Sequence, residues 1–89
     1  MKNLLFIFGV CLANNMYATT NADSSQFYFS QGMIEKNAKR FLTASSNFEK
    51  AIAFNKSFTD AYVENGYSNK EMRKTDQAKA NFLKAYELQ

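Results

Sequence analysis

The chain has 89 residues, enough for one small domain, and its net charge of +3 makes it only mildly basic. It contains no His and a single Cys, Cys11, which excludes an imidazole base, an intramolecular disulfide and a Cys/His metal site. Most catalytic constellations therefore cannot be built, and we expect no enzyme activity, no cofactor and no metal.

The first 22 residues have the composition of a secretory signal segment. Lys2 supplies a positive start, and residues 4–13 (LLFIFGVCLA) form an apolar core that is too short to cross a bilayer of about 30 Å as a helix. Cleavage after Ala18 or Ala22 would meet the small-residue requirement at the cut. We therefore expect a signal peptide over 1–22, export to the periplasm or the medium, and membrane contact only through this segment.

Three other interpretations of the N-terminal segment stay open. Cys11 could carry a lipid, although Val10 precedes it and the apolar run continues through Leu12, which does not fit the usual lipid-attachment box. The segment could instead be an apolar helix that packs on the rest of the chain. It could also stay attached and tether the protein to a membrane.

The chain from residue 19 to residue 55 is expected to form a polar linker and two helices. Residues 19–25 (TTNADSS) are the linker, at whose end Ser24 or Ser25 could cap the first helix, with Asp23 adding favourable charge. The first helix is predicted over about 26–38. The second is predicted over about 41–55, because its apolar residues return at three- and four-residue steps.

A second helical pair follows after a connection at 56–58. The third helix is predicted from Thr59 or Asp60 to about residue 72, with Thr59 as its cap. Arg73 and the residue after it make the turn. Thr75 could then cap a fourth helix that continues to the end of the chain. The apolar face of this helix consists of Ala78, Phe82, Ala85, Tyr86 and Leu88.

The main signal in the chain is a period of 34 residues. Laying 25–55 over 59–89 gives eight identities, where about two are expected by chance from ordinary composition. The pairs are Tyr28/Tyr62, Gly32/Gly66, Lys36/Lys70, Ala44/Ala78, Asn47/Asn81, Phe48/Phe82, Lys50/Lys84 and Ala51/Ala85. A fixed period of this size is typical of stacked helical units.

This spacing resembles the tetratricopeptide repeat, in which an aromatic residue and a glycine in the first helix precede Ala-x3-Phe and a further Ala in the second. The resemblance covers 25–89. It implies an all-α fold of two antiparallel helical hairpins stacked as a short solenoid, with repeat one at 25–58 and repeat two at 59–89. The residues expected to pack the repeats are Tyr28, Gly32, Ala44, Phe48, Ala51, Tyr62, Gly66, Ala78, Phe82 and Ala85.

The chain departs from the family's pattern at several positions. Polar residues replace the apolar residue before each glycine and a later tyrosine, and neither the turn glycine nor the closing proline is present. The replacements are Gln31, Asn65, Glu35, Asn69, Lys39, Arg73 and Lys56. They weaken the expected packing without changing the register.

In the family, the first helix of each repeat lines a concave groove for peptides. The resemblance implies a groove lined by Phe29, Met33, Lys36, Asn37, Val63, Tyr67, Lys70 and Glu71. Lys36 and Lys70 above an apolar floor would suit a peptide with acidic and apolar positions. In the alternative interpretation both lysines are solvated, and Phe29, Met33 and Tyr67 complete a core. The family's carboxylate-gripping activity is not expected, because Phe29 and Met33 stand where polar residues are required.

The remaining charged residues are expected to be structural. The basic pairs at 39–40 and 73–74 could touch phosphate or anionic headgroups, but they also sit where a helix C-terminus favours positive charge. Glu64 and Glu71 are spaced for one helix face and are expected to be solvated. Export further disfavours nucleic acid as a ligand.

These patterns predict an exported protein–protein interaction module that binds a peptide or helix of a partner protein. The alternative is an accessory or truncated segment of a larger exported assembly or enzyme, whose repeats serve only for packing or oligomerisation. Repeats usually need a neighbour or a polar capping helix, and the second repeat has none before the chain ends at Gln89. A longer array, self-association through Ala78, Phe82 and Tyr86, or ordering on a partner would each supply one.

Overall fold

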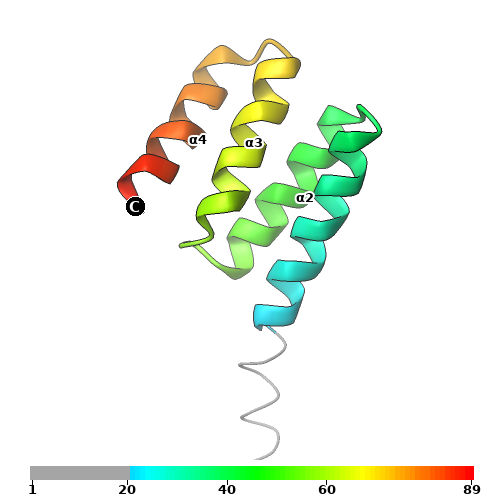
Figure 1. Ribbon diagram of the computed structural model, residues 1–89, viewed down its shortest axis with the longest axis vertical. Helices are drawn as coiled ribbons and strands as arrows, with labels where there is room; N and C mark the ends of the chain where they lie inside the picture. The colour runs from blue at the N-terminus through cyan, green and yellow to red at the C-terminus, as the bar shows by residue number, and fades with distance from the viewer. Residues whose placement is uncertain (1–20) are drawn as a thin grey trace, which may run out of the picture.

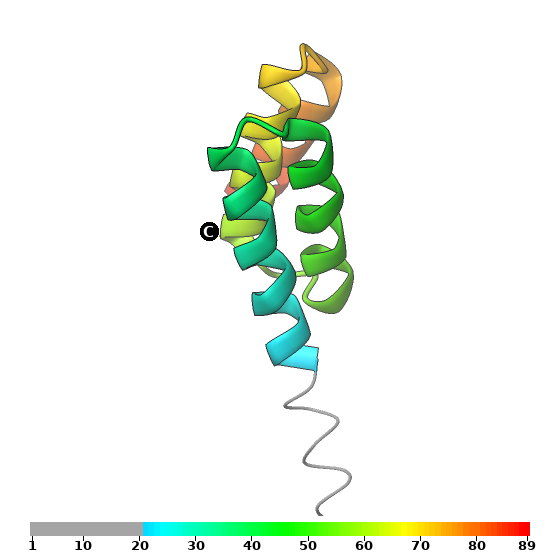
Figure 2. The same ribbon diagram turned by 90° about the vertical axis from the view of Figure 1, so that its right-hand side faces the viewer.

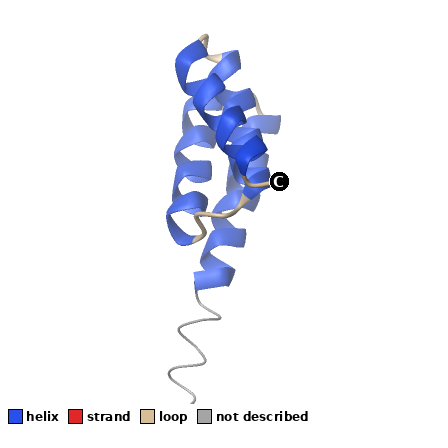
Figure 3. Ribbon diagram, turned by 90° about the vertical axis from the view of Figure 1, so that its left-hand side faces the viewer, coloured by secondary structure: helices blue, strands red, loops and turns tan. Residues whose placement is uncertain are grey.

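The computed structural model describes residues 21–89, and every regular element in that range is an α-helix (Figure 3). A first helix is described over 21–37, followed by α2 (Phe41–Phe54), α3 (Thr59–Glu71) and α4 (Thr75–Glu87) (Figure 1). None of the helices described between 21 and 89 is long and apolar enough to cross a membrane. The expected signal core at 4–13, Cys11 and the cleavage site after Ala18 lie outside the described residues.

The helices form two antiparallel pairs that lie side by side (Figures 1 and 2). The first helix pairs with α2, and α3 pairs with α4. α3 also contacts α2, whereas α2 and α4 do not contact each other. The all-α prediction is confirmed for the described residues, and α2, α3 and α4 begin and end within two residues of the predicted positions.

The start of the first helix differs from the prediction. Residues 21–25 are already helical, so the expected linker does not extend to 25 and the expected boundary between residues 22 and 23 falls within a helix. Ser25 does not cap a helix end. Its side chain is buried and its hydroxyl donates a hydrogen bond to the carbonyl oxygen of Ala51, at 3.0 Å. A polar side chain that bonds a neighbouring helix looks like a linker residue when only composition is considered.

The core is built mainly from alanines and one phenylalanine. The fully or nearly fully buried apolar residues are Ala44, Phe48, Ala51, Ala61, Ala78 and Ala85. Phe48 is completely buried and occupies the space left by Gly32, because a Cβ at that glycine would lie 2.5 Å from the ring. The same contact recurs 34 residues later between Gly66 and Phe82, at 2.6 Å. The glycines therefore allow the two helices of each pair to approach closely.

Both hairpin turns have the same hydrogen-bonded structure. At the first, the Arg40 N–H donates to the Glu35 carbonyl and the Lys39 N–H donates to the Lys36 carbonyl, each at 2.9 Å. This pattern is a Schellman motif, whose penultimate residue adopts the left-handed conformation. Lys39 has φ 63°, and Arg73, its equivalent in the second turn, has φ 60°. Lysine and arginine thus occupy positions at which glycine has no steric cost.

The predicted threonine caps are wrong. Thr59 and Thr75 are the first residues of α3 and α4, and the N-cap positions belong to Phe58 and Lys74. Neither N-cap side chain makes a capping hydrogen bond. The free backbone N–H groups at these helix starts are instead close to Asp60 and Asp76, whose charges are favourable in a first helical turn.

The interface between the two hairpins is unusually polar. Ser45 of α2 donates a hydrogen bond to the side-chain oxygen of Asn65 of α3 at 2.6 Å, and both residues are buried. Ser68 is completely buried, and its hydroxyl has no hydrogen-bond partner among the described residues. Asn69 is also buried. α3 therefore presents serine and asparagine where a helix in such a position normally presents apolar side chains.

Candidate functional site: the Tyr67 groove

A groove of about 460 Å³ lies where the first hairpin turn approaches α3. We call it the Tyr67 groove. It is lined by Lys36, Asn37, Lys39, Phe41, Tyr67 and Glu71. Four of these residues, Lys36, Asn37, Tyr67 and Glu71, belong to the set expected from the sequence to line a concave groove.

Tyr67 supplies the aromatic surface of the groove. Its side chain is 47% exposed although its ring also packs edge-on against Phe82, with centroids 5.1 Å apart. The Lys36 ammonium lies 5.6 Å from the centre of the Tyr67 ring, within the range of a cation–π contact. The tyrosine is therefore held by Phe82 and Lys36, while about half of its side chain remains accessible.

The charge of Lys36 is compensated within the protein. Its ammonium forms a half-buried ion pair with Glu64 of α3, which joins the two hairpins. The expectation that Glu64 is solvated is therefore wrong. Lys39 is exposed and has no ion-pair partner among residues 21–89, so it supplies the uncompensated positive charge at the groove. Glu71 supplies a negative charge on the α3 side.

The other four expected groove residues do not line this groove. Phe29 packs on Phe48 and on Phe58, with ring centroids 5.7 and 4.8 Å apart, and so serves the core. Met33 and Val63 are partly buried, and Lys70 is exposed. The structure therefore separates the two repeated lysines, because Lys36 faces the second hairpin while Lys70 faces solvent.

An exposed ion pair stands beside the groove at the first turn. Arg40 forms an ion pair with Glu35, and its terminal nitrogen also donates to the second carboxylate oxygen at 3.3 Å. The hydrogen bond from Arg40 lowers the pKa of the Glu35 carboxyl, and that pairing in turn raises the pKa of the guanidinium. Arg40 is thus occupied, which leaves Lys39 as the cation of this turn that can meet a ligand.

Two groove residues were not expected from the sequence. The sequence predicts Lys39 in place of the turn glycine and as one of a basic pair, and it predicts Phe41 on the apolar packing face of the second helix. Both line the groove because the left-handed residue at the turn brings the start of α2 beside the end of the first helix. The missing turn glycine was the available signal, since a long side chain at that position must project from the turn.

The expected self-association face is only partly accessible. Tyr86 of α4 is 74% exposed, but Ala78 is buried within the hairpin and Phe82 is half-buried against Gly66 and Tyr67. Ala78 therefore packs the second hairpin and cannot supply contact area to another molecule in this structure.

Comparison with known proteins gave no relative on which to base a function. No protein-family model matches the chain, and no match was found among curated proteins or among solved structures.

Proposed function

We propose that this chain is an exported tetratricopeptide-like module that binds a peptide segment of a partner protein in the Tyr67 groove. The observation that carries the proposal is the accessible Tyr67 ring in one groove with Lys39, whose ammonium has no ion-pair partner among residues 21–89. Aromatic side chains with one fixed face give large contact area at low entropic cost, and they are enriched at binding hot spots.

The recurrence of packing contacts supports assigning the fold to stacked helical repeats. Gly32 contacts Phe48 as Gly66 contacts Phe82, and both hairpins turn through the same left-handed residue 34 positions apart. In a solenoid of this kind, each repeat packs mainly on its neighbour and leaves a continuous surface for ligands.

The charged and aromatic side chains of the Tyr67 groove indicate which residue types a bound peptide should have. Lys39 favours an acidic residue near the hairpin turn, whereas Glu71 disfavours one at the α3 side. Tyr67 and Phe41 favour an apolar or aromatic residue between them. We therefore expect a short motif with an apolar anchor and an acidic residue on one side only.

A selection experiment tests this function. The full chain is immobilised and used to select from a display library of random 12-residue peptides, and enriched peptides are measured by calorimetry. Tyr67→Ala should weaken their binding by about 1 kcal/mol or more, or at least about fivefold. Selection on the Lys39→Glu variant should enrich fewer acidic peptides than selection on the parent chain. Enrichment of no peptide, or of peptides that bind Tyr67→Ala as well as the parent, would reject the groove.

Two variants of α4 serve as matched controls. Tyr86→Ala removes another exposed tyrosine, and Lys84→Glu reverses another exposed lysine, and neither residue lines the groove. Both variants should bind the selected peptides like the parent chain. Loss of binding in these controls would indicate a nonspecific aromatic or charge effect.

Export is a separate part of the proposal and has its own test. The full chain is expressed in a bacterial host with a periplasm, and the protein is recovered by cell fractionation and weighed by mass spectrometry. A periplasmic product that begins at Thr19 or Asp23 is expected. A product that retains residues 4–13 would instead support a membrane tether.

The alternative, a packing segment of a larger assembly, is favoured by apolar side chains outside the groove. Phe27 and Ile34 of the first helix are 57% and 55% exposed. Their equivalents 34 residues later, Ala61 and Ser68, are completely buried against the first hairpin. A further helical unit could cover the first helix in the same manner. Sedimentation equilibrium of the full chain would support this alternative if it shows only oligomers.

A further inference from the structure

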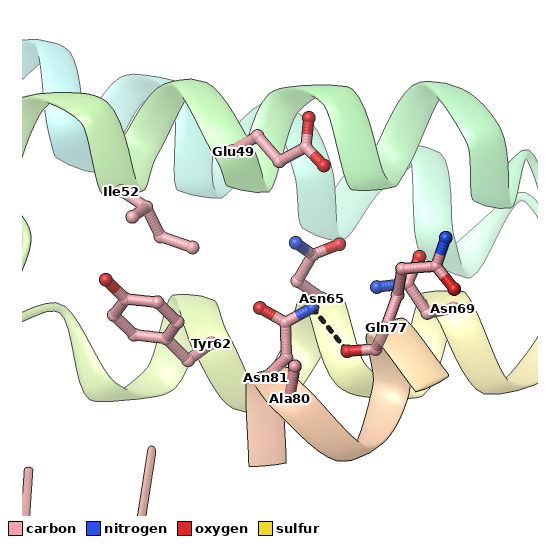
Figure 4. Close-up of a pocket in the computed structure, with 8 residues that line it drawn as sticks. All are labelled: Glu49, Ile52, Tyr62, Asn65, Asn69, Gln77, Ala80 and Asn81. Atoms are coloured by element: carbon pink, nitrogen blue, oxygen red, sulfur yellow. Dashed lines mark hydrogen bonds between the residues drawn. The ribbon is translucent and has the colours of Figure 1, made fainter. Parts of the chain in front are cut away.

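A second opening, separate from the Tyr67 groove, lies over α3 between α2 and α4 (Figure 4). Its volume is about 270 Å³, and we call it the amide cleft. Asn65 and Asn69 of α3 lie on its floor, with Glu49 of α2 on one wall and Gln77 and Asn81 of α4 on the other. The cleft exists because α2 and α4 both pack on α3 without contacting each other.

The floor of the amide cleft holds hydrogen-bonding capacity that the protein does not use. Asn69 is only 4% exposed, and among residues 21–89 no group forms a hydrogen bond with its carboxamide. Asn65 is 2% exposed, and its oxygen accepts from Ser45 while its amide nitrogen has no acceptor in the same part of the chain. The Ser68 hydroxyl is the one fully buried side-chain polar atom without a partner among residues 21–89, so the free amide atoms of Asn65 and Asn69 still reach the cleft, where a bound group can replace water as their hydrogen-bond partner.

The spacing of the two asparagines suits an extended peptide. Residues four apart on a helix are separated by about 6 Å along its axis. In an extended chain, peptide groups that face the same side recur every two residues, or about 6.6 to 6.8 Å. One carboxamide can therefore meet each of two successive same-side peptide groups, donating to a carbonyl and accepting from an N–H.

The charge of the residues that line the amide cleft restricts the charge of the peptide that can bind there. Among the described residues that line the cleft, Glu49 is the one charged side chain, and none is a lysine or arginine. Asn81 donates its amide to the Gln77 carbonyl at 3.0 Å, which leaves its side-chain oxygen as an acceptor toward the cleft. An acidic ligand would meet the Glu49 carboxylate without a compensating cation. A neutral or basic segment would meet no such penalty.

We propose that the amide cleft is a second binding site, which takes an uncharged or basic peptide segment in extended conformation through backbone hydrogen bonds to Asn65 and Asn69. The site is spatially separate from the Tyr67 groove and shares no lining residue with it. On a helix with 3.6 residues per turn, Tyr67 is displaced by about 200° from each asparagine, so the two sites use opposite sides of α3.

The test uses the full chain and a display library of nine-residue peptides without Asp or Glu, selected in parallel on the Tyr67→Ala variant. The Tyr67→Ala variant removes the other site, and enrichment on it is expected. Asn69→Leu, which keeps the number and branching of the side-chain heavy atoms but cannot form hydrogen bonds, should weaken binding of the enriched peptides about tenfold. The side-chain amide resonances of Asn65 and Asn69 should shift on titration with the same peptides.

Glu49→Lys provides a second variant in case Asn69→Leu does not fold. Glu49 is exposed, so its replacement should leave the fold intact while it lowers the preference for basic over acidic versions of one enriched peptide. Ser46→Ala, an exposed change on α2 outside the lining, should alter neither measurement. No enrichment on Tyr67→Ala, unchanged binding by Asn69→Leu, or binding of a soluble oligosaccharide panel in place of peptides would overturn the proposal.

Discussion

Replacing the two glycines by alanine tests the packing of each hairpin separately. Alanine in a helix interior is favoured over glycine by about 1 kcal/mol, so each substitution begins with a gain. A Cβ at Gly32 would lie 2.5, 2.7 and 3.0 Å from three atoms of the Phe48 ring. At Gly66 the distances to Phe82 are 2.6, 2.8 and 2.9 Å, so the overlap is nearly the same.

The two glycine positions differ in how far the neighbouring phenylalanine ring can move. Phe48 is completely buried, whereas Phe82 is half-buried at the second hairpin and can tilt toward solvent. Overpacking in a closed core costs about 1–3 kcal/mol, which exceeds the helical gain at Gly32. We therefore expect Gly32→Ala to destabilise the protein by up to about 2 kcal/mol, and Gly66→Ala to change its stability by less than about 0.5 kcal/mol.

Urea unfolding followed by circular dichroism measures both effects. In a domain of this size about 1 kcal/mol corresponds to a shift of about 4–8 °C in melting temperature, so thermal melts give an independent estimate. Phe48→Leu in the Gly32→Ala background should recover part of the loss, because it removes ring atoms that the new Cβ meets. Equal destabilisation at the two glycines, or strict additivity of Gly32→Ala and Phe48→Leu, would refute this account of the packing.

Three further predictions concern single positions. Lys39→Gly and Arg73→Gly should each raise the free energy of unfolding by about 1 kcal/mol, because both residues have positive φ, and thermal melts would show it. Ser68→Ala should leave stability unchanged or raise it by about 1 kcal/mol in urea unfolding, since it removes a buried hydroxyl that has no partner in the described part of the chain. Glu35→Gln should destabilise the protein at pH 7 but not in acid. Because Arg40 lowers the folded-state pKa of Glu35 below its ordinary 4.5, the pair's contribution is present above pH 4.5 and is lost as the pH falls through the folded-state value. Thermal melts of the parent chain and the Glu35→Gln variant should give melting temperatures that converge as the pH falls.

The 34-residue period was sufficient to predict the helices, but hydrophobic periodicity alone would have missed α3. The buried face of α3 consists of Ala61, Gly66, Asn65, Ser68 and Asn69, which has little amphipathic contrast. α2 and α4 bury alanines and phenylalanine at three- and four-residue steps, which is the usual helical signal. The register of α3 could therefore be found only by comparison with the first repeat.

The start of the first helix and much of the groove could not be predicted from local sequence. Ser25 resembles a capping residue in a polar stretch, and only the position of Ala51 on the neighbouring helix explains why it is buried. The pairing of Lys36 with Glu64 depends on how the second hairpin packs on the first, across 28 residues. An equal role for the two repeated lysines was a reasonable expectation from periodicity, but only the first has a following hairpin in the described chain.

The polar residues of α3 link the packing of the repeats to both candidate sites. Asn65 and Asn69 are polar and nearly buried, so the second hairpin gains less from burial than apolar side chains at these positions would give. Ser45 donates a hydrogen bond to the side-chain oxygen of Asn65, and the amide nitrogen of Asn65 and the carboxamide of Asn69 line the amide cleft. A ligand that formed hydrogen bonds with these amide groups would stabilise the packing of α3 on α2. Tyr67 also belongs to α3. Occupation of the amide cleft should therefore favour the arrangement of α3 in which the Tyr67 groove is complete.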